Sequence, residues 1–222
     1  MALDAEDMVP VPTIRRLPLY LQYLRTLDAK GRDIVSCTFI AKALSFTDTQ
    51  VRKDLSYTGL GGKPKVGYAI KELIASIEDF LGWNNTRDAF LVGAGSLGMA
   101  LLGYDGFRDH GLNLVAAFDV DPEKIGATIR GRQVFHISKI LDLAARLHVK
   151  IVVLATPESK AQEAADLSIM AGIQAIWNFT PATLVCPGEI IVEDVRLYGS
   201  LAALTSRLKQ AVETIKPVVQ EE

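Results

Sequence analysis

The stretch Asp88-Ala-Phe-Leu-Val-Gly-Ala-Gly-Ser-Leu-Gly98 decides the fold of the second half of this chain. An apolar run leads into the pattern Gly93-x-Gly95-x-x-Gly98, and the residues that follow are typical of a helix. In such a turn Gly93 permits the sharp bend, Gly95 lets a pyrophosphate approach the backbone, and Gly98 lets the helix pack on the strand. The pattern predicts a dinucleotide-binding turn formed by Gly93, Ala94, Gly95, Ser96, Leu97 and Gly98.

A second apolar segment, residues 112 to 118, is expected to form a neighbouring strand that ends at Asp119. A carboxylate about 20 residues after the last glycine accepts hydrogen bonds from the adenosine ribose in dinucleotide-binding domains. Because it would repel a 2′-phosphate, and Asp121 adds to that repulsion, the sequence favours NADH or NAD over the phosphorylated cofactor. A similar domain without nucleotide, or one that binds coenzyme A, is the alternative, and Asp119 argues for a ribose with a free 2′-OH.

The second half alternates strands and helices, which predicts an α/β fold with a doubly wound parallel sheet. Strands are expected at 89 to 92, 112 to 118, around Val134, 149 to 155, 173 to 179 and 189 to 195, with helices at 96 to 108, 138 to 147 and 158 to 171. Ligands of such sheets lie beyond the carboxyl ends of the strands. Thr156, Pro157 and Asn178 are therefore expected to line the same crevice, although ordinary turn chemistry before a proline explains Thr156 and Asn178 equally well.

The charge of the chain is unevenly distributed. The net charge is -2, yet the segment from Thr13 to Lys71 holds eleven basic residues and four acidic ones. The rest of the chain is therefore acidic. A basic segment joined to an acidic one indicates that the first part meets a polyanion and the second does not.

Three short helices are predicted in this basic segment. The first starts near Thr13 and carries leucines at helical spacing, the second is capped by Ser36, and the third spans 47 to 57. This arrangement is typical of a helix-turn-helix. The residues expected to contact DNA on the third helix are Gln50, Arg52, Lys53, Ser56 and Tyr57, because such side chains read base edges or hold phosphates.

Residues 59 to 68 combine glycines and a proline with Lys63 and Lys65, which predicts a β-hairpin wing against DNA. The alternative for this half is a plain three-helix bundle with a solvated basic face. A helix over 69 to 81 is expected to close the first domain, with a linker at 82 to 86. Beyond the α/β unit, Leu197, Leu201, Leu204 and Leu208 indicate an amphipathic helix that is either a lid on its own sheet or a dimer element.

Composition narrows the class of protein. The chain has 222 residues, 49% of them hydrophobic, which suffices for two domains with cores. It has neither an apolar run of membrane-spanning length nor a signal-peptide pattern at its start, so we expect a cytoplasmic protein without a membrane partner. Cys37 and Cys186 lack the spacing of a metal site, and no metal is expected.

Several motifs together carry a family resemblance. They are Arg16-Leu-Pro-Leu-Tyr20, Val51-Arg-Lys-Asp-Leu-Ser-Tyr57, Gly67-Tyr68, Gly93-Ala-Gly-Ser-Leu-Gly98, Phe118-Asp-Val-Asp121 followed by Lys124-Ile-Gly126, and Gly172-Ile173 leading into Asn178-Phe-Thr-Pro181. Over nearly its whole length the chain resembles the Rex family of redox-sensing transcriptional repressors. The resemblance implies a homodimer that holds operator DNA at a low NADH/NAD ratio and releases it when NADH binds.

The resemblance also implies a domain plan: a winged-helix DNA-binding domain at 1–83, a Rossmann NAD(H)-binding domain at 84–196, and a C-terminal helix at 197–222 that is exchanged between subunits. Family members commonly have an aspartate that pairs with an arginine of the first helix. Here Arg196 occupies that aspartate position while Arg16 is retained, so Asp194 or Glu193 is expected to take over the pairing. The interdomain switch is predicted at Arg16, Tyr104, Asp194 and Arg196.

An enzyme is the competing interpretation, namely an NAD-dependent oxidoreductase with an accessory helical domain. Catalysis would require a proton donor near the nicotinamide. His110, His136 and His148 are expected at a helix end, on a short strand and just before a strand, where none supplies that donor. The sequence therefore predicts a regulator and not an enzyme.

Overall fold

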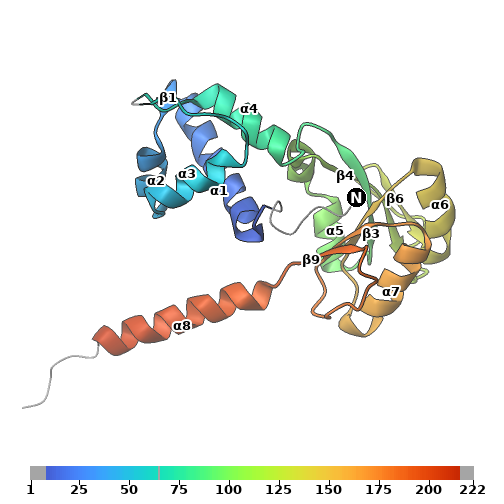
Figure 1. Cartoon of the computed structure of the whole chain (residues 1–222). Helices are drawn as coiled ribbons and strands as arrows, with labels where there is room; N and C mark the ends of the chain where they lie inside the picture. Colours follow the sequence, from blue (N-terminus) through green and yellow to red (C-terminus); the bar gives the residue numbers. More distant parts are fainter. Residues whose placement is uncertain (1–8, 65, 216–222) are drawn as a thin grey trace, which may run out of the picture. The chain divides into compact units, whose positions relative to one another are not determined.

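The computed structural model describes residues 9 to 64 and 66 to 215, and for residues 213 to 215 it describes the backbone alone. The chain forms two compact units (Figure 1). The first contains the residues up to Thr86 together with Asp109–Gly111, and the second contains Arg87–Arg108 and the chain from Leu112 onward.

The first unit is built around α1 (Val11–Ala29), and the buried residues of this helix in the common core are Leu17, Tyr20, Leu21, Leu24 and Leu27. Helix α2 (Cys37–Leu44) begins where the Ser36 hydroxyl accepts from the Phe39 N–H, and α3 (Asp48–Ser56) begins where the Thr47 hydroxyl accepts from the Gln50 N–H. Each cap satisfies a backbone donor that the first helical turn leaves unpaired. Helix α4 (Ile70–Phe80) completes the core through Ile70, Leu73 and Ile77.

The predicted wing differs from a simple hairpin over 59 to 68. Strand β2 (Tyr68–Ala69) pairs antiparallel with β1 (Ile34–Val35), which lies before α2, and the remaining hairpin is one bridge between Lys63 and Gly67. Gly67 has a φ of +104°, and a Cβ there would overlap the Val35 backbone, so the two backbones approach closely only at a glycine. The order of elements is that of a winged helix. Lys65, predicted at the tip, lies outside the described residues.

The second unit contains a seven-stranded sheet of order β5-β6-β4-β3-β7-β8-β9. Its parallel strands are β3 (Arg87–Val92), β4 (Leu112–Asp119), β6 (Arg132–His136), β7 (Ile151–Leu154), β8 (Ala175–Asn178) and β9 (Ile191–Asp194). The doubly wound parallel sheet is therefore confirmed. Strand order reverses direction at β3, the strand that leads into the glycine-rich turn, so the switch point where such folds bind ligands lies at the carboxyl end of β3.

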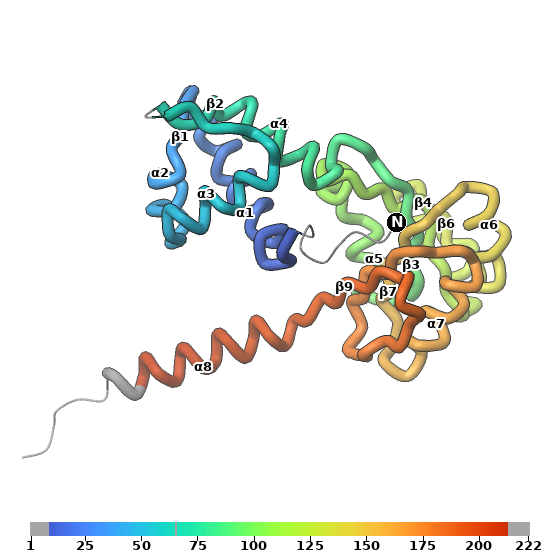
Figure 2. Tube along the Cα trace, in the orientation of Figure 1, coloured from blue at the N-terminus to red at the C-terminus, as the bar shows by residue number. Residues whose placement is uncertain are grey.

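Helices cover both faces of this sheet (Figures 1 and 2). Helices α6 (Ile140–Leu147) and α7 (Glu158–Met170) share one core cluster with Phe90 and Phe118. Helix α5 (Ser96–Leu102) packs through Leu102 into the cluster on the other face. Short apolar strands with side chains buried in both clusters explain the nearly continuous hydrophobic runs in the sequence.

Two details of this unit differ from the sequence prediction. The helix expected over 96 to 108 ends at Leu102, because Gly103 and Gly106 disfavour its continuation, and a 3₁₀ segment follows at Asp105–His110. An unpredicted strand, β5 (Thr128–Ile129), pairs antiparallel with β6 through a turn in which Arg130 and Gly131 both have positive φ. Such turns usually carry Asn-Gly, a signal this sequence lacks.

The last helix, α8 (Leu197–Ile215), presents an uncovered apolar stripe. The stripe consists of Leu197, Leu201, Leu204, Leu208 and Val212, and each of these side chains is more than half exposed. In the single chain, α8 is therefore not a lid buried on its own sheet. None of the helices in the described part of the chain has the length and hydropathy needed to cross a membrane.

Candidate nucleotide crevice and DNA-binding face

The three glycines of the turn after β3 have different surroundings. Gly93 has a φ of +98°, and a Cβ there would lie 2.6 Å from the carbonyl oxygen of Ala155. A Cβ at Gly98 would overlap the carbonyl oxygen of Gly93, whereas a Cβ at Gly95 would meet nothing within 4 Å. Gly93 and Gly98 are therefore required by the fold itself. Gly95 faces open space, as a residue that a pyrophosphate approaches should.

Asp119, at the end of β4, connects two loops through backbone hydrogen bonds. The N–H of Ala94 donates to Oδ2 at 2.8 Å, and the N–H groups of Val120 and Asp121 donate to Oδ1 at 2.8 and 2.9 Å. Burial raises the pKa of this carboxyl, but the backbone donors and Lys124 outweigh burial and hold the pKa below its ordinary value. Asp119 is thus a fixed anion whose geometry depends on the main chain.

A cavity of about 520 Å³ lies beside Asp119. Its polar edge contains Gly93, Gly95 and Asp119, and the loops after β7 contribute Thr156 and Pro157. The cavity is also lined by residues that the sequence interpretation did not assign to the site: Val120, Ile137, Lys160, Glu163, Ala164 and Leu167. Most are ordinary helix or turn residues, and only their proximity in the folded sheet identifies them.

A second cavity of about 780 Å³ adjoins the first and shares Gly95, Ala155, Thr156 and Pro157 with it. Ser96 and Leu97 line it from the glycine-rich turn, and Phe179, Thr180 and Tyr198 are among its other walls. Where the cavities meet, Thr156 Oγ1 is buried and has no hydrogen-bond partner among the described residues. A buried hydroxyl of this kind is costly unless a ligand or water satisfies it. The two cavities thus form one crevice with two halves.

Three residues predicted to touch the nucleotide lie below the crevice. Ala94 and Gly98 are buried and line neither cavity. Asn178 is 1% exposed, donates to Asp194 and to the Ala182 carbonyl, and accepts from the N–H and hydroxyl of Thr180. Its amide is fully used inside the protein. The structure therefore supports the turn-chemistry explanation for Asn178, which shapes the loop after β8.

The predicted DNA-contacting residues lie on the outer side of α3. Arg52, Lys53 and Ser56 are exposed, and Gln50 and Tyr57 are partly exposed. Arg52 pairs with Asp48 one turn earlier at 2.7 Å, and the Ser56 hydroxyl donates to the Lys53 carbonyl. Arg52 and Lys63 line the same groove of about 460 Å³ between α2, α3 and the wing. Residues distant in sequence are thus gathered on one basic face of the first unit.

The inner side of α3 carries a carboxylate to which the sequence interpretation gave no role. Asp54 is 1% exposed and accepts two hydrogen bonds from Arg16, from Nε and Nη2, each at 2.7 Å. It also accepts from the Tyr20 hydroxyl at 2.7 Å and the Thr13 hydroxyl at 2.8 Å. All four donors come from one face of α1. We call Thr13, Arg16, Tyr20 and Asp54 the α1–α3 clamp.

The clamp changes the acidity of its members. Burial raises the pKa of Asp54, but hydrogen bonds from Arg16, Tyr20 and Thr13 outweigh it, so the pKa is lower than usual. Burial, and then the hydrogen bond to Asp54, raise the pKa of Tyr20. At neutral pH the clamp therefore consists of two neutral hydroxyls, those of Thr13 and Tyr20, and the ion pair of Arg16 with Asp54. The signal in the sequence was the position of Asp54 beside Leu55 on the buried face, where a lone carboxylate needs partners.

The predicted switch residues have partners within their own units. Arg16 belongs to the clamp, whereas Asp194 pairs with Arg196 at 2.8 Å. Tyr104 is 58% exposed and packs edge to face on Phe107. A switch through these residues stays a prediction.

Metal and cysteine chemistry receive no support from the described residues. Within residues 9 to 64 and 66 to 215, no cluster of three or more His, Cys, Asp or Glu side chains could hold a metal ion. Cys37 and Cys186 are both free thiols, and burial raises the pKa of each above its ordinary value. Neither thiol is prepared for nucleophilic chemistry.

Comparisons with known proteins fit both halves. Residues 84–182 match the family described as "CoA binding domain", and residues 8–56 match "Putative DNA-binding protein N-terminus". Two curated relatives are named "Redox-sensing transcriptional repressor Rex". The protein from Porphyromonas gingivalis is 44% identical over 92% of this chain and 94% of its own, and that from Treponema denticola is 45% identical over 90% and 96%.

Solved structures of a Rex-family repressor called RSP are also similar. RSP in complex with β-NAD+ and operator DNA is 34% identical, with a TM-score of 0.86 over 96% of this chain and 99% of that one. RSP in complex with β-NADH has the same identity and a TM-score of 0.84 over 94% and 99%. The similarity covers both units and the terminal helix.

Proposed function

This chain belongs to the Rex family of redox-sensing transcriptional repressors, and from that premise we propose that it binds operator DNA and releases it when NADH binds. The observation that carries the proposal is the similarity, across nearly the whole chain, to a repressor solved with operator DNA and NAD+ and solved again with NADH. The physical support is a basic face in one unit and a two-part crevice in the other.

The crevice residues fit NADH and NAD. Asp119 is placed to accept from the adenosine ribose, while the apolar residues Ile137 and Leu167 offer the first cavity to adenine. The open backbone at Gly95 and the unpartnered Thr156 hydroxyl suit the pyrophosphate and its neighbouring ribose. The second cavity then receives the nicotinamide, the part that carries a positive charge when oxidised and none when reduced. The coenzyme A match describes the fold, since the Asp119 carboxylate would repel the 3′-phosphate that coenzyme A carries on its ribose.

The DNA-binding face would use α3 in the major groove. Gln50, Arg52 and Lys53 supply base or phosphate contacts there, with Ser56 and Tyr57 toward the backbone and Lys63 and Lys65 in the wing. The α1–α3 clamp supports this arrangement, because a fixed recognition helix presents its outer side chains in one orientation. The protein would act in the cytoplasm.

A homodimer follows from the exposed stripe of α8. A row of leucine side chains that are each more than half exposed to water is energetically unfavourable. A second copy of the chain carries the same apolar stripe and can bury it. Two DNA-binding units in one dimer would read two half-sites, so a change in dimer geometry on NADH binding would weaken both contacts together. Exchange of α8 between subunits is part of the proposal.

The alternative, an NAD-dependent oxidoreductase, lacks a positioned histidine. None of the three histidines lines either half of the described crevice. His110 packs edge to face on Trp83 in the first unit, and His136 caps a short turn through the Ser138 N–H. We therefore assign the chain no catalytic step.

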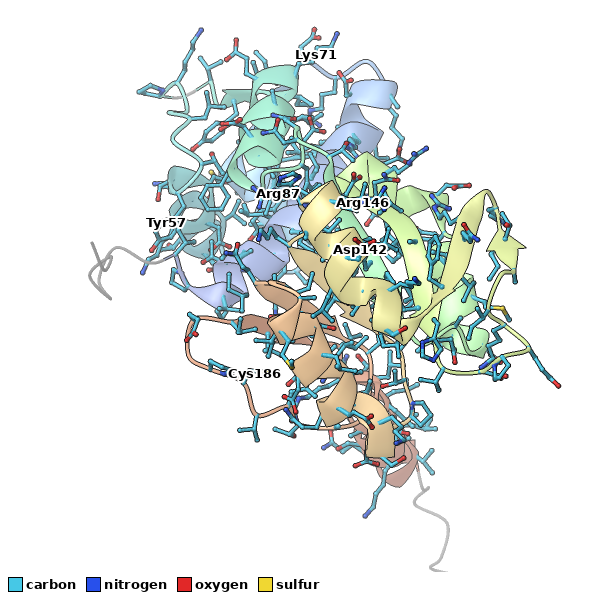
Figure 3. The ribbon with its side chains drawn as sticks, turned by 90° about the vertical axis from the view of Figure 1, so that its right-hand side faces the viewer. Tyr57, Lys71, Arg87, Asp142, Arg146 and Cys186 are labelled. Atoms are coloured by element: carbon cyan, nitrogen blue, oxygen red, sulfur yellow. The ribbon has the colours of Figure 1, made fainter. Side chains whose placement is uncertain are left out.

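The test uses a DNA duplex selected for binding from a random library. Arg52→Ala is expected to weaken DNA binding by about 1 to 3 kcal/mol, because it removes a base or phosphate contact, and to leave NADH affinity unchanged. Arg146→Ala is the matched control, since Arg146 also pairs with an aspartate one turn away, Asp142, on α6 of the other unit (Figure 3). Equal DNA affinity in both variants would remove α3 from the interface.

A further inference from the structure

The wall of the second cavity contains one ion pair. Among the described residues that line this cavity, Asp194 and Arg196 are the charged ones. Arg196 Nη2 lies 2.8 Å from Asp194 Oδ2. Asp194 is the last residue of β9, so both side chains follow the carboxyl end of a strand, where ligands of this fold bind.

The two members of the pair are held differently. The Nδ2 group of buried Asn178 donates to Asp194 Oδ1 at 2.8 Å, so a side chain of the protein interior holds the carboxylate in place. The Asp194 side chain is 27% exposed, whereas the Arg196 side chain is 68% exposed. The Asp194 carboxylate is thus fixed in the cavity wall, and the more exposed Arg196 side chain pairs with it. Without Arg196, a fixed negative charge would face the cavity.

The charge of the wall matters because the two forms of the nicotinamide differ by one positive charge. A fixed carboxylate attracts the oxidised, cationic ring and has no comparable attraction for the neutral reduced ring. The inference rests on the proposed function, in which this cavity takes the nicotinamide. We propose that Arg196 sets the preference of the site for NADH over NAD+, because it neutralises the carboxylate that would otherwise hold the oxidised ring. The ion pair is partly exposed, so its effect is moderate and should shrink as salt concentration rises.

The experiment measures dissociation constants for NADH and NAD+ by calorimetry on the full chain. Arg196→Gln should lower the ratio of the NAD+ constant to the NADH constant by roughly three- to tenfold, mainly through tighter NAD+ binding. Asp194→Asn, which keeps an oxygen for Asn178, should raise the ratio. The double variant should lie between the two single variants, near the wild type.

Control variants separate a charge effect from damage to the fold. Arg146→Gln and Asp142→Asn remove the members of a similar exposed ion pair on α6 that lines neither cavity, and both should leave the ratio unchanged. Repeating the measurement at high salt should reduce the shifts in the Arg196 and Asp194 variants. If the role of Arg196 were merely structural, Arg196→Gln would weaken the binding of NADH and of NAD+ by the same factor, and the ratio of the two dissociation constants would not change.

The outcomes distinguish this inference from the proposed function. If the wild type binds neither nucleotide, the proposed function fails and the inference fails with it. If the wild type binds both and the ratio is unchanged in Arg196→Gln and Asp194→Asn, or moves in the same direction in both, this inference alone is overturned. Opposite shifts that salt weakens would establish it.

Discussion

Each unit contains a carboxylate that organises its binding surface, and the two are held by different means. Asp54 is fixed by side chains alone, from Arg16, Tyr20 and Thr13. Asp119 is fixed mainly by backbone N–H groups, from Ala94, Val120 and Asp121. The DNA-binding surface therefore depends on side-chain identity at a few positions. The nucleotide crevice depends on main-chain conformation, and its sensitive positions are glycines.

The largest effect expected from this contrast is the loss of the α1–α3 clamp. Asp54→Ala should destabilise the first unit by about 3 to 5 kcal/mol, because the buried Tyr20 hydroxyl and the partly buried Arg16 guanidinium lose their partner. The chain has two tryptophans, Trp83 in the first unit and Trp177 in the second. In urea unfolding followed by tryptophan fluorescence, the midpoint of the Trp83 transition should move to lower urea, and the midpoint of the Trp177 transition should stay in place. The Trp83 signal is measured in a Trp177→Phe background, and the Trp177 signal in a Trp83→Phe background. Equal shifts of both signals would contradict the contrast.

The glycine-rich turn offers the corresponding test in the second unit. Gly93→Ala should cost about 1 to 3 kcal/mol or more of stability, because alanine is strained at a φ of +98° and crowds Ala155. Gly95→Ala should leave stability nearly unchanged, since its Cβ meets nothing within 4 Å, yet weaken NADH binding roughly tenfold by obstructing the pyrophosphate. Thermal unfolding and calorimetry measure the two effects. A stable Gly93→Ala variant, or Gly95→Ala with full NADH affinity, would refute the assigned roles.

A smaller effect concerns cofactor choice at Asp119. Asp119→Ala should weaken NADH by about 1.5 kcal/mol, near tenfold, because an acceptor for the ribose is lost. The affinity for NADPH should fall less, since the repulsion between the carboxylate and the 2′-phosphate of NADPH is removed at the same time. The measurement is the ratio of the two dissociation constants. Asp121→Asn serves as the control for the local field, and an unchanged ratio in Asp119→Ala would assign the choice to another group.

The smallest effect is the response to acid. Both carboxyls have a folded-state pKa below the ordinary value, so their stabilisation is fully present above the pKa of the unfolded chain, about 4. It is lost as pH falls through the folded-state pKa. Asp54→Asn should flatten the dependence of the Trp83 transition on pH below that value and leave the Trp177 transition as steep as before. Identical pH profiles in variant and wild type would show that Asp54 does not titrate with folding.

The sequence predicted the parts of this molecule that depend on local pattern. The cap at Ser36, the apolar strands and the glycine turn are each encoded within a few residues, and the structure has them. The wing was predicted only in outline, because β1 and β2 are more than 30 residues apart and their pairing depends on the close approach at Gly67. Long-range pairings of this kind leave no local signal.

The sequence predicted some residues of the nucleotide crevice and of the DNA-binding unit but not others. The glycine-rich turn and Asp119 follow from spacing, but Ile137, Glu163 and Leu167 enter the crevice only because the fold brings the segment after β6 and helix α7 to the cavity beside Asp119. The sequence left the role of Asn178 open, since a buried amide that shapes a loop has the same sequence signature as one that contacts a ligand. Asp54 was overlooked because its partners lie more than 30 residues away on α1.

The central claim is that the two units communicate, so that NADH in one weakens DNA binding by the other. The most direct test is a pair of titrations at one fixed salt concentration: operator DNA with and without saturating NADH, and NADH with and without saturating operator. Linkage requires the two factors to be equal, and we predict that each ligand raises the dissociation constant of the other by the same factor, roughly 5- to 150-fold. Wild-type protein that binds both ligands with no change in either constant would contradict the account.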